Sequence, residues 1–201
     1  GSVSEGLQIT GNTITVLRTT INGSGTHKMQ IGEASIAFVT SVLIKDSIIS
    51  GTGTNDIRVH GAGTSTNTTI NATLLNVTGA TLMQKSGFAD ADNASLYFQN
   101  YLDVYVNDTA GAAVSGATIN ITNSTGDLVA QLTTNSTGHI VQQNVTYRFW
   151  YGNSTDTLDA YYDNHTIAAS KTGYVSNSTS LNMSSNQNTY LTLTAATLNV
   201  A

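Results

Sequence analysis

The sequence predicts an all-β protein with two parts, a short right-handed parallel β-helix followed by a β-sandwich. Three observations lead to this fold class. Short apolar segments alternate with turns rich in Gly, Ser, Thr and Asn, a loose repeat recurs in the first half, and period-2 alternation of apolar and polar residues marks the second half. We place the two domains at residues 1–100 and 101–201.

The repeat in the first half consists of the segments 17–25, 44–53 and 70–79. Each segment closes on a glycine, and these glycines, Gly25, Gly53 and Gly79, recur at nearly equal intervals. A regular recurrence of this kind indicates stacked supersecondary units, and short strands without helical periodicity suit the coils of a β-helix. A second β-sandwich remains the alternative for this half.

The second half begins with a strand in which Leu102, Val104 and Val106 alternate with polar residues, followed by a turn and another alternating strand. Regular spacing of short strands with turns between them is typical of a β-sandwich. The longest loop is expected at residues 152–163. The predicted strands are 102–106, 117–122, 128–133, 139–150, 164–170, 177–183 and 188–195.

Two motifs in this half carry a family resemblance. The order of strand, Asp-x-x-Gly turn (108–111), Val-x-Gly-Ala segment (114–117) and strand resembles the opening of carboxypeptidase-regulatory-like, or prealbumin-like, domains. The Lys-x-Gly-Tyr segment at 171–174 resembles a later part of the same domains, whereas Ala113 stands where the family usually has proline. The resemblance implies an Ig-like or prealbumin-like sandwich, used as an accessory domain in many extracellular proteins.

The end of the first half is similar to the last coils of archaeal β-helix surface proteins of the periplasmic copper-binding, NosD-like type. In those proteins the final coil often runs into a Tyr-Leu-Asp-Val-x-Val strand, such as 101–106 here. This resemblance implies an archaeal source and a place at the cell surface.

The strongest compositional signal is the density of N-glycosylation acceptors, Asn-x-Ser/Thr without proline. Chance would give about 5 in a chain of this composition, and the sequence has 14. The excess indicates an exported, heavily glycosylated protein, although a Thr- and Asn-rich β protein would also produce some acceptors incidentally. The acceptors are Asn22, Asn67, Asn71, Asn76, Asn93, Asn107, Asn120, Asn123, Asn135, Asn144, Asn153, Asn164, Asn177 and Asn182.

Charge and cysteine content narrow the possible partners. Charged residues make up 9% of the chain, the net charge is −5, and the seven basic residues are scattered singly, so we expect no binding to nucleic acid or anionic lipid. The chain has no cysteine, which excludes a disulfide framework or a thiolate metal site. No apolar run approaches the length of about 18 residues that a membrane span needs.

No group of residues indicates a catalytic site, and we predict that the protein is not an enzyme. The histidines are dispersed and share no ligand-like spacing, and no Gly-x-Ser-x-Gly motif is present. Two groups of carboxylates resemble parts of oxygen-rich calcium sites, but solvated loop acids are the simpler interpretation, so we predict no cofactor other than a possible structural calcium. The calcium candidates are Asp90, Asp92, Asp156, Asp159 and Asp163.

Aromatic residues gather at 147–151 in the second half. Tyr147, Phe149 and Tyr151 alternate with Arg148 and Trp150, which favours packing in a core or between domains over a sugar-binding platform.

These observations predict a structural subunit of an N-glycosylated extracellular assembly such as a filament, tube, sheath or surface layer. A β-helix of about four coils has open backbone edges at its ends, and another copy of the chain would satisfy them by strand addition. An open first coil, with apolar Leu7, Ile9 and Ile14 facing a neighbour, would favour assembly, whereas a capping helix or a polar cleft would favour the alternatives. The alternatives are a monomeric adhesin or carbohydrate-binding fragment of a larger surface protein, and a β-helix enzyme acting on polysaccharide.

Overall fold

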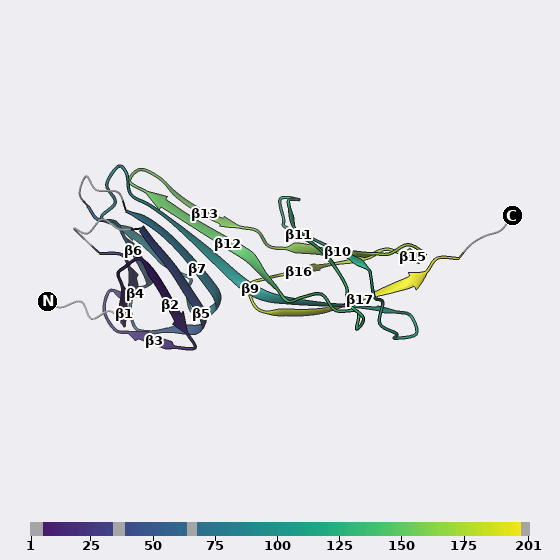
Figure 1. The fold of residues 1–201 in the computed structure, drawn as a ribbon. Helices are drawn as coiled ribbons and strands as arrows, with labels where there is room; N and C mark the ends of the chain where they lie inside the picture. Colours follow the sequence, from purple (N-terminus) through teal and green to yellow (C-terminus); the bar gives the residue numbers. More distant parts are fainter. Residues whose placement is uncertain (1–5, 34–38, 64–67, 198–201) are drawn as a thin grey trace. The chain divides into compact units, whose positions relative to one another are not determined.

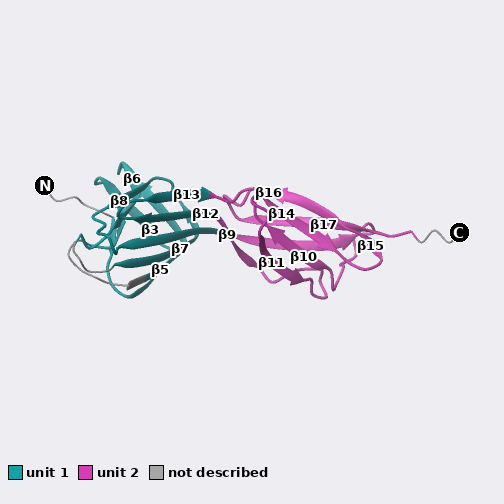
Figure 2. Ribbon diagram, turned by 90° about the horizontal axis from the view of Figure 1, so that it is seen from above, with its two compact units in different colours: residues 1–99, 148–160 teal, residues 100–147, 161–201 magenta. Residues whose placement is uncertain are grey.

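The computed structural model describes residues 6–33, 39–63 and 68–197, and within these ranges every regular element is a strand (Figure 1). The all-β prediction is therefore confirmed for the described residues. The chain forms two compact units, residues 1–99 with 148–160 and residues 100–147 with 161–201 (Figure 2). Unit 1 thus also takes residues 148–160, a segment that the sequence analysis assigned to the second half.

Unit 1 contains two ladders of parallel strands. One ladder is formed, in order, by β1 (Leu7–Ile9), β4 (His27–Ile31), β6 (Asn55–His60) and β8 (Met83–Ser86). The other is formed by β2 (Thr13–Leu17), β5 (Val39–Gly51), β7 (Thr69–Thr78) and β9 (Asn93–Asp108), and β3 (Thr20–Gly23) also pairs with β5. Each circuit of the chain therefore adds one strand to both ladders.

The ladder registers show where the sequence repeat fails. The interval of 26 residues between Gly53 and Gly79 agrees with the register of β6 and β8, in which Ile57 pairs with Met83. It disagrees with the register of β5 and β7, in which Ile44 pairs with Leu74 rather than with Ile70. The alignment was therefore wrong for these two strands, because Ile57 of β6 follows Ile44 of β5 by 13 positions, whereas Met83 of β8 follows Leu74 of β7 by only 9.

Apolar side chains stack along the interior of unit 1. Ile44, Leu74 and Phe98 occupy equivalent positions on β5, β7 and β9, and all three are buried. On the other ladder, buried Met29 lies level with buried Ile57. Each strand gains burial only when the next one stacks on it, so the strands of this unit depend on their neighbours for stability.

One corner of unit 1 repeats a strained backbone conformation in three successive circuits. Arg18, Asp46 and Asn76 have φ values of 50°, 52° and 54°, and the parallel registers place them in one column. Asn76 Nδ2 donates a hydrogen bond to Asp46 Oδ1 at 2.8 Å, which links two of the circuits. Asn and Asp adopt this left-handed region more readily than other non-glycine residues.

A hairpin from later in the chain completes the second ladder. β12 (Gln143–Asn153) lies next to β9, and β13 (Thr157–Tyr161) lies next to β12. The prediction that residues 152–163 form one long loop was therefore wrong. Asp159 within β13 forms an ion pair with Arg148 of β12, so an acid that sequence analysis read as a loop residue holds a strand in place.

Unit 2 is a sandwich of two β layers. One layer is an antiparallel sheet with the order β11 (Leu128–Thr133), β10 (Thr118–Thr122), β14 (His165–Ser170) and β16 (Asn177–Leu181). In the other layer, β17 (Gln187–Ala195) pairs in parallel with β9 and antiparallel with the short β15 (Tyr174–Val175). The seven strands predicted for this half correspond to β9, β10, β11, β12, β14, β16 and β17; β13 and β15 were not predicted.

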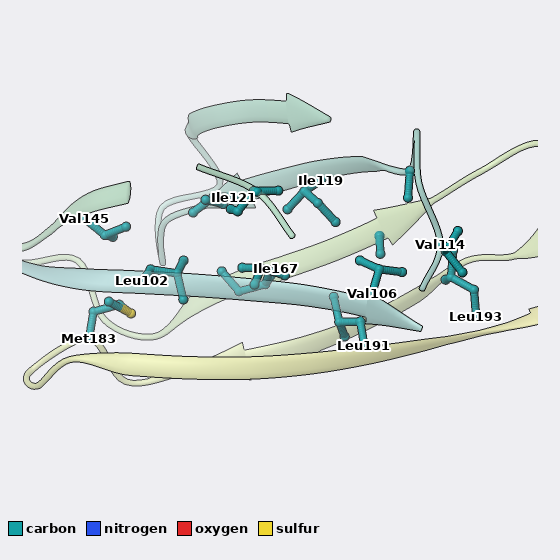
Figure 3. Packing of buried hydrophobic residues seen from close by; sticks show 14 residues of the cluster. Leu102, Val106, Val114, Ile119, Ile121, Val145, Ile167, Met183, Leu191 and Leu193 are labelled. Atoms are coloured by element: carbon teal, nitrogen blue, oxygen red, sulfur yellow. The ribbon is translucent and has the colours of Figure 1, made fainter. Parts of the chain in front are cut away.

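The core of unit 2 comes from the alternating positions on which the sandwich prediction depends. Leu102, Val104 and Val106 of β9 are buried, while the polar residues between them are only partly buried. Figure 3 shows this packing between the layers, and the side chains that it labels come from both layers and from segments that connect their strands. These are Leu102, Val106, Val114, Ile119, Ile121, Val145, Ile167, Met183, Leu191 and Leu193.

Candidate functional site

Thirteen of the 14 glycosylation acceptors lie among the described residues, and none of the thirteen is buried. Asn67 lies outside the described residues. The exposed acceptors are Asn22, Asn71, Asn135, Asn144, Asn164, Asn177 and Asn182. The partly buried acceptors are Asn76, Asn93, Asn107, Asn120, Asn123 and Asn153.

Three of the glycosylation-acceptor asparagines share one local geometry, in which the side-chain oxygen accepts hydrogen bonds from the residues of the turn that follows. Asn135 Oδ1 accepts hydrogen bonds from Thr137 N at 2.9 Å, Thr137 Oγ1 at 2.7 Å and His139 N at 3.1 Å. Asn123 and Asn153 likewise accept the hydroxyl of their own acceptor threonine, at 2.7 and 3.2 Å. This is the side-chain-to-backbone bonding by which asparagine favours turns.

Three other acceptors use their amide nitrogen to hold the fold, and one of them, Asn93, donates from Nδ2 to Thr69 Oγ1 at 3.4 Å. Asn76 Nδ2 donates to Asp46, and Asn177 Nδ2 donates to the carbonyl oxygen of Thr192 at 3.0 Å. A glycan would be linked through this same nitrogen, so these amides would have to keep their bonds with one remaining N–H. Their positions fit glycosylation less well than the exposed turn of Asn135.

The first pair of calcium candidates does not form a ligand set. Asp90 is exposed, whereas Asp92 is buried and its two oxygens accept Thr68 N at 2.7 Å and Ala89 N at 2.8 Å. Asp92 therefore closes a turn between two strands. In the described ranges no three His, Cys, Asp or Glu residues come together as metal ligands.

The other calcium candidates each have a separate role. Asp156 accepts the Thr155 hydroxyl at 3.0 Å, and Asp159 pairs with Arg148. Asp163 Oδ1 accepts the backbone N–H of Met183 at 2.8 Å. The absence of a cofactor stays a prediction.

His165 is the histidine with the most unusual surroundings. It is fully buried at the start of β14, where Asp163 Oδ1 lies 3.4 Å from Nδ1 and neither ring nitrogen makes a hydrogen bond of good geometry. Burial lowers the pKa of His165 below the ordinary value of 6.5, and this outweighs the opposing effects of the Asp163 carboxylate and of a backbone group of Thr146. Above pH 6.5 the folded protein therefore favours the neutral imidazole inside unit 2.

Because His165 is buried, we expect the free energy of unfolding to fall as the pH is lowered below neutrality. Because its pKa is lower in the folded state, the unfolded chain binds the proton more readily, so the stabilisation is complete above pH 6.5 and declines as the pH falls through that value. One proton limits the slope to about 1.4 kcal/mol per pH unit. Urea unfolding followed by circular dichroism between pH 5 and 8 measures it. A His165→Leu chain should lose this dependence and a His60→Gln chain should keep it; an unchanged profile in His165→Leu would contradict the assignment.

The antiparallel sheet of unit 2 has open edges on its outer strands. β11 and β16 are the outer strands of the antiparallel sheet in unit 2. β11 contains no charged residue, and Leu128 and Val129 within it are 58% and 43% exposed. Soluble proteins usually protect such edges with lysine, proline or a covering segment. β11 lacks the first two devices, so its outer side is suited to pairing with another strand.

An aromatic row on the outer face of unit 2 was not predicted from the sequence. The parallel register places Tyr190 of β17 level with Tyr105 of β9, and His139 pairs with Tyr105 on the other side. The Tyr105 ring stacks on both neighbours, with centroids 4.4 Å from His139 and 5.0 Å from Tyr190. The sequence separates these residues widely, and only period-2 alternation on both strands could have placed the tyrosines outside the core.

The aromatic segment that sequence analysis did single out behaves as predicted for packing. Arg148 and Trp150 are buried, while Tyr147, Phe149 and Tyr151 are partly buried. The centroids of the Phe149 and Tyr97 rings lie 5.0 Å apart.

No family model matches the chain, and no curated protein matches it. Among solved structures it is similar to the major pilin subunit BcpA of Bacillus cereus (15% identity over 47% of this chain and 28% of that chain, TM-score 0.27). It is also similar to the TIE protein of Bacillus anthracis (16%, 59% and 20%, TM-score 0.30) and to the shaft pilin SpaA of Lactobacillus rhamnosus GG (13%, 60% and 55%, TM-score 0.29).

The chain spans between 20% and 55% of the length of these solved chains. Similarities at such low identity and TM-score establish neither the fold nor the function of this chain. The prealbumin-like and NosD-like resemblances therefore stay predictions. None of the described residues forms a helix that could cross a membrane.

Proposed function

We propose that this chain is a structural subunit of an N-glycosylated extracellular assembly, such as a filament, tube, sheath or surface layer, whose copies join by adding strands to open sheet edges. In this proposal unit 1 is a short right-handed β-helix and unit 2 is a prealbumin-like sandwich of an archaeal surface protein. The observation that carries the proposal is the uncharged, partly apolar outer strand β11. The expectation that the chain is not an enzyme belongs to the same proposal.

The physical basis of the joining step is the set of unpaired backbone groups on an edge strand. A strand from a second copy would satisfy these groups and cover Leu128 and Val129 at the same time. With 9% charged residues in the whole chain, little like-charge repulsion opposes close approach of two copies. Low charge and an open edge therefore both favour association of two copies.

A single lysine on this edge is expected to disrupt assembly. Val129→Lys places a charge that must lose its water when a second strand pairs with β11, so self-association should weaken tenfold or more, about 1.4 kcal/mol. Sedimentation velocity and electron microscopy of the purified chain measure the change.

The matched control for this variant is Val141→Lys, because Val141 is exposed but lies outside the strands. It should assemble like the parent chain. Equal assembly of Val129→Lys and the parent would exclude the β11 edge as the contact. If the parent remains dispersed under all conditions, a monomeric adhesin becomes the better interpretation, and the aromatic row of unit 2 is the observation that favours it.

The glycosylation part of the proposal is supported by the acceptors that remain accessible in the folded protein. Attachment would join C1 of an activated, phosphate-linked sugar to the asparagine Nδ2, with departure of the phosphate-linked group and loss of one amide proton. The native protein should therefore have an intact mass above that of its bare polypeptide, to which these 201 residues contribute 21.0 kDa. Peptide mapping should find glycans on exposed acceptors such as Asn135 and Asn144. An intact mass equal to that of the bare chain in native material would contradict it.

A further inference from the structure

The aromatic row of unit 2 has the geometry of a stacking surface. Its ring planes are nearly parallel, at 19° between Tyr105 and His139 and 15° between Tyr105 and Tyr190. The centroids are separated by only 4.4 and 5.0 Å, distances that are typical of offset-stacked rings. The two strands hold the tyrosines in register, and Tyr190 remains 65% exposed. Tyr105 is stacked between its two neighbours, so the ring of the row that is most open to solvent is that of Tyr190, which the register holds in place.

We propose that the row formed by His139, Tyr105 and Tyr190 binds a pyranose ring, and that its first occupant is the glycan carried by Asn107 of the same chain. This inference rests on the glycosylation part of the proposed function. The C–H groups on one face of a pyranose carry partial positive charge, and they favour the negative face of an aromatic ring.

Polar groups beside the row can fix the orientation of a sugar. Asp103 lies two residues before Tyr105 on β9, and its oxygens accept His139 Nε2 at 2.9 Å and Gln142 Nε2 at 2.7 Å. These two donors hold the carboxylate in one position, and each oxygen has a second lone pair for a sugar hydroxyl. The exposed Asn188 amide lies level with Asp103 on β17. A few placed polar groups around an apolar surface are the usual composition of a ligand site.

The position of Asn107 identifies the occupant. Asn107 follows Tyr105 by two residues on β9, so both side chains lie on the same face, about 7 Å apart along the strand. Its partner on β17 is Thr192, two residues beyond Tyr190. A glycan attached at Asn107 thus begins beside the row, and its first or second sugar reaches the rings without any change in the fold. A saccharide of another molecule offers the same chemistry and is the second possible source.

The test is a double-mutant cycle on glycosylated, dispersed protein, which makes it independent of whether copies assemble. Tyr190→Ser should lower the melting temperature by about 2–4 °C when the Asn107 glycan is present, and by clearly less in the Asn107→Gln background. Tyr161→Ser is the matched control, because Tyr161 is similarly exposed at 60% but lies outside the row. It should have the same effect in both backgrounds.

The second arm distinguishes the two sources of sugar. Unglycosylated Asn107→Gln protein is titrated with chitotriose and cellotriose, and amide shifts at Asp103, Tyr105, Asn188 and Tyr190 are followed by NMR. Coupling in the cycle supports the chain's own glycan, and shifts confined to these residues support an external saccharide. Absence of both coupling and shifts would overturn the proposal. If mass spectrometry shows Asn107 to be unoccupied, the glycan source is excluded and the titration alone decides.

Discussion

A chain carrying Asp56→Ala is expected to lose about 3–5 kcal/mol of its free energy of unfolding, because the substitution leaves a partly buried lysine without its counter-charge. Asp56 is buried at the start of β6 and connects neighbouring circuits of unit 1. Oδ1 accepts Lys28 Nζ at 2.7 Å, and Oδ2 accepts Thr81 N, Thr81 Oγ1 and Leu82 N at 2.8, 2.7 and 2.7 Å. Its removal would leave three donors of the next turn unpaired as well.

The measurement has a convenient probe. Trp150 is the only tryptophan of the chain and is buried in unit 1, so its fluorescence in a urea titration reports unfolding of that unit. Asp90→Ala, which removes an exposed carboxylate, should leave the midpoint unchanged, and Asp56→Asn should fall between the two. An Asp56→Ala midpoint equal to that of Asp90→Ala would show that the network does not stabilise the unit.

The same carboxylate gives the network a pH dependence of known sign. Burial alone would raise the pKa of Asp56, but hydrogen bonds from Lys28, Leu82 and Thr81 outweigh it and hold the pKa below the ordinary 3.8. Its stabilising effect is therefore complete above pH 3.8 and is lost as the pH falls through the lower folded-state value. This window lies well below the one expected for His165, so an acid titration can separate them.

The sequence predicted the strands of unit 2 well because their cores are formed by simple alternation. Leu102, Val104 and Val106 fill one face of β9, and the pattern alone identifies both the strand and its buried side. The loose repeat of the first half likewise anticipated strands that recur at nearly regular intervals along the chain. Its weakness was register. The chain takes fewer residues from Leu74 of β7 to Met83 of β8 than from Ile44 of β5 to Ile57 of β6, so aligning the glycines places β5 and β7 four residues out of register.

The features that sequence analysis missed depend on residues that meet only after folding. The donors to Asp56 lie 25 to 28 residues away along the chain. Tyr105 and Tyr190 meet because β17 returns in parallel beside β9. Neither pairing leaves a local pattern of spacing, whereas each alternating strand does. The same reason explains why β13 was read as a loop, since Asp159 meets its partner Arg148 only in the folded hairpin.

Arg148→Ala is expected to be the second most damaging change, with a cost of about 3 kcal/mol in the free energy of unfolding. The guanidinium makes a two-pronged bond to Asp159, with Nε and Nη2 each 2.8 Å from a carboxylate oxygen. Nη1 donates to the carbonyl oxygens of Thr81 at 2.9 Å and Ala80 at 3.3 Å, and the group lies 4.7 Å from the centre of the Phe98 ring. We use the low end of the range for breaking a buried pair because the Asp159 side chain is 38% exposed, which allows water to screen it.

The variants Arg148→Lys and Asp159→Asn separate the parts of this network. Lysine keeps the charge but cannot span both Asp159 oxygens and the two backbone carbonyls, so it should recover only a minor part of the loss. Asp159→Asn leaves the carbonyl bonds and the contact with Phe98 intact and should cost less than Arg148→Ala. Trp150 fluorescence again reports the result, because Trp150 lies two residues along the same strand. If Asp159→Asn cost as much as Arg148→Ala, the hairpin would be held by the ion pair alone, and the carbonyls of Ala80 and Thr81 would have no part in fastening β12 to the last circuit of unit 1.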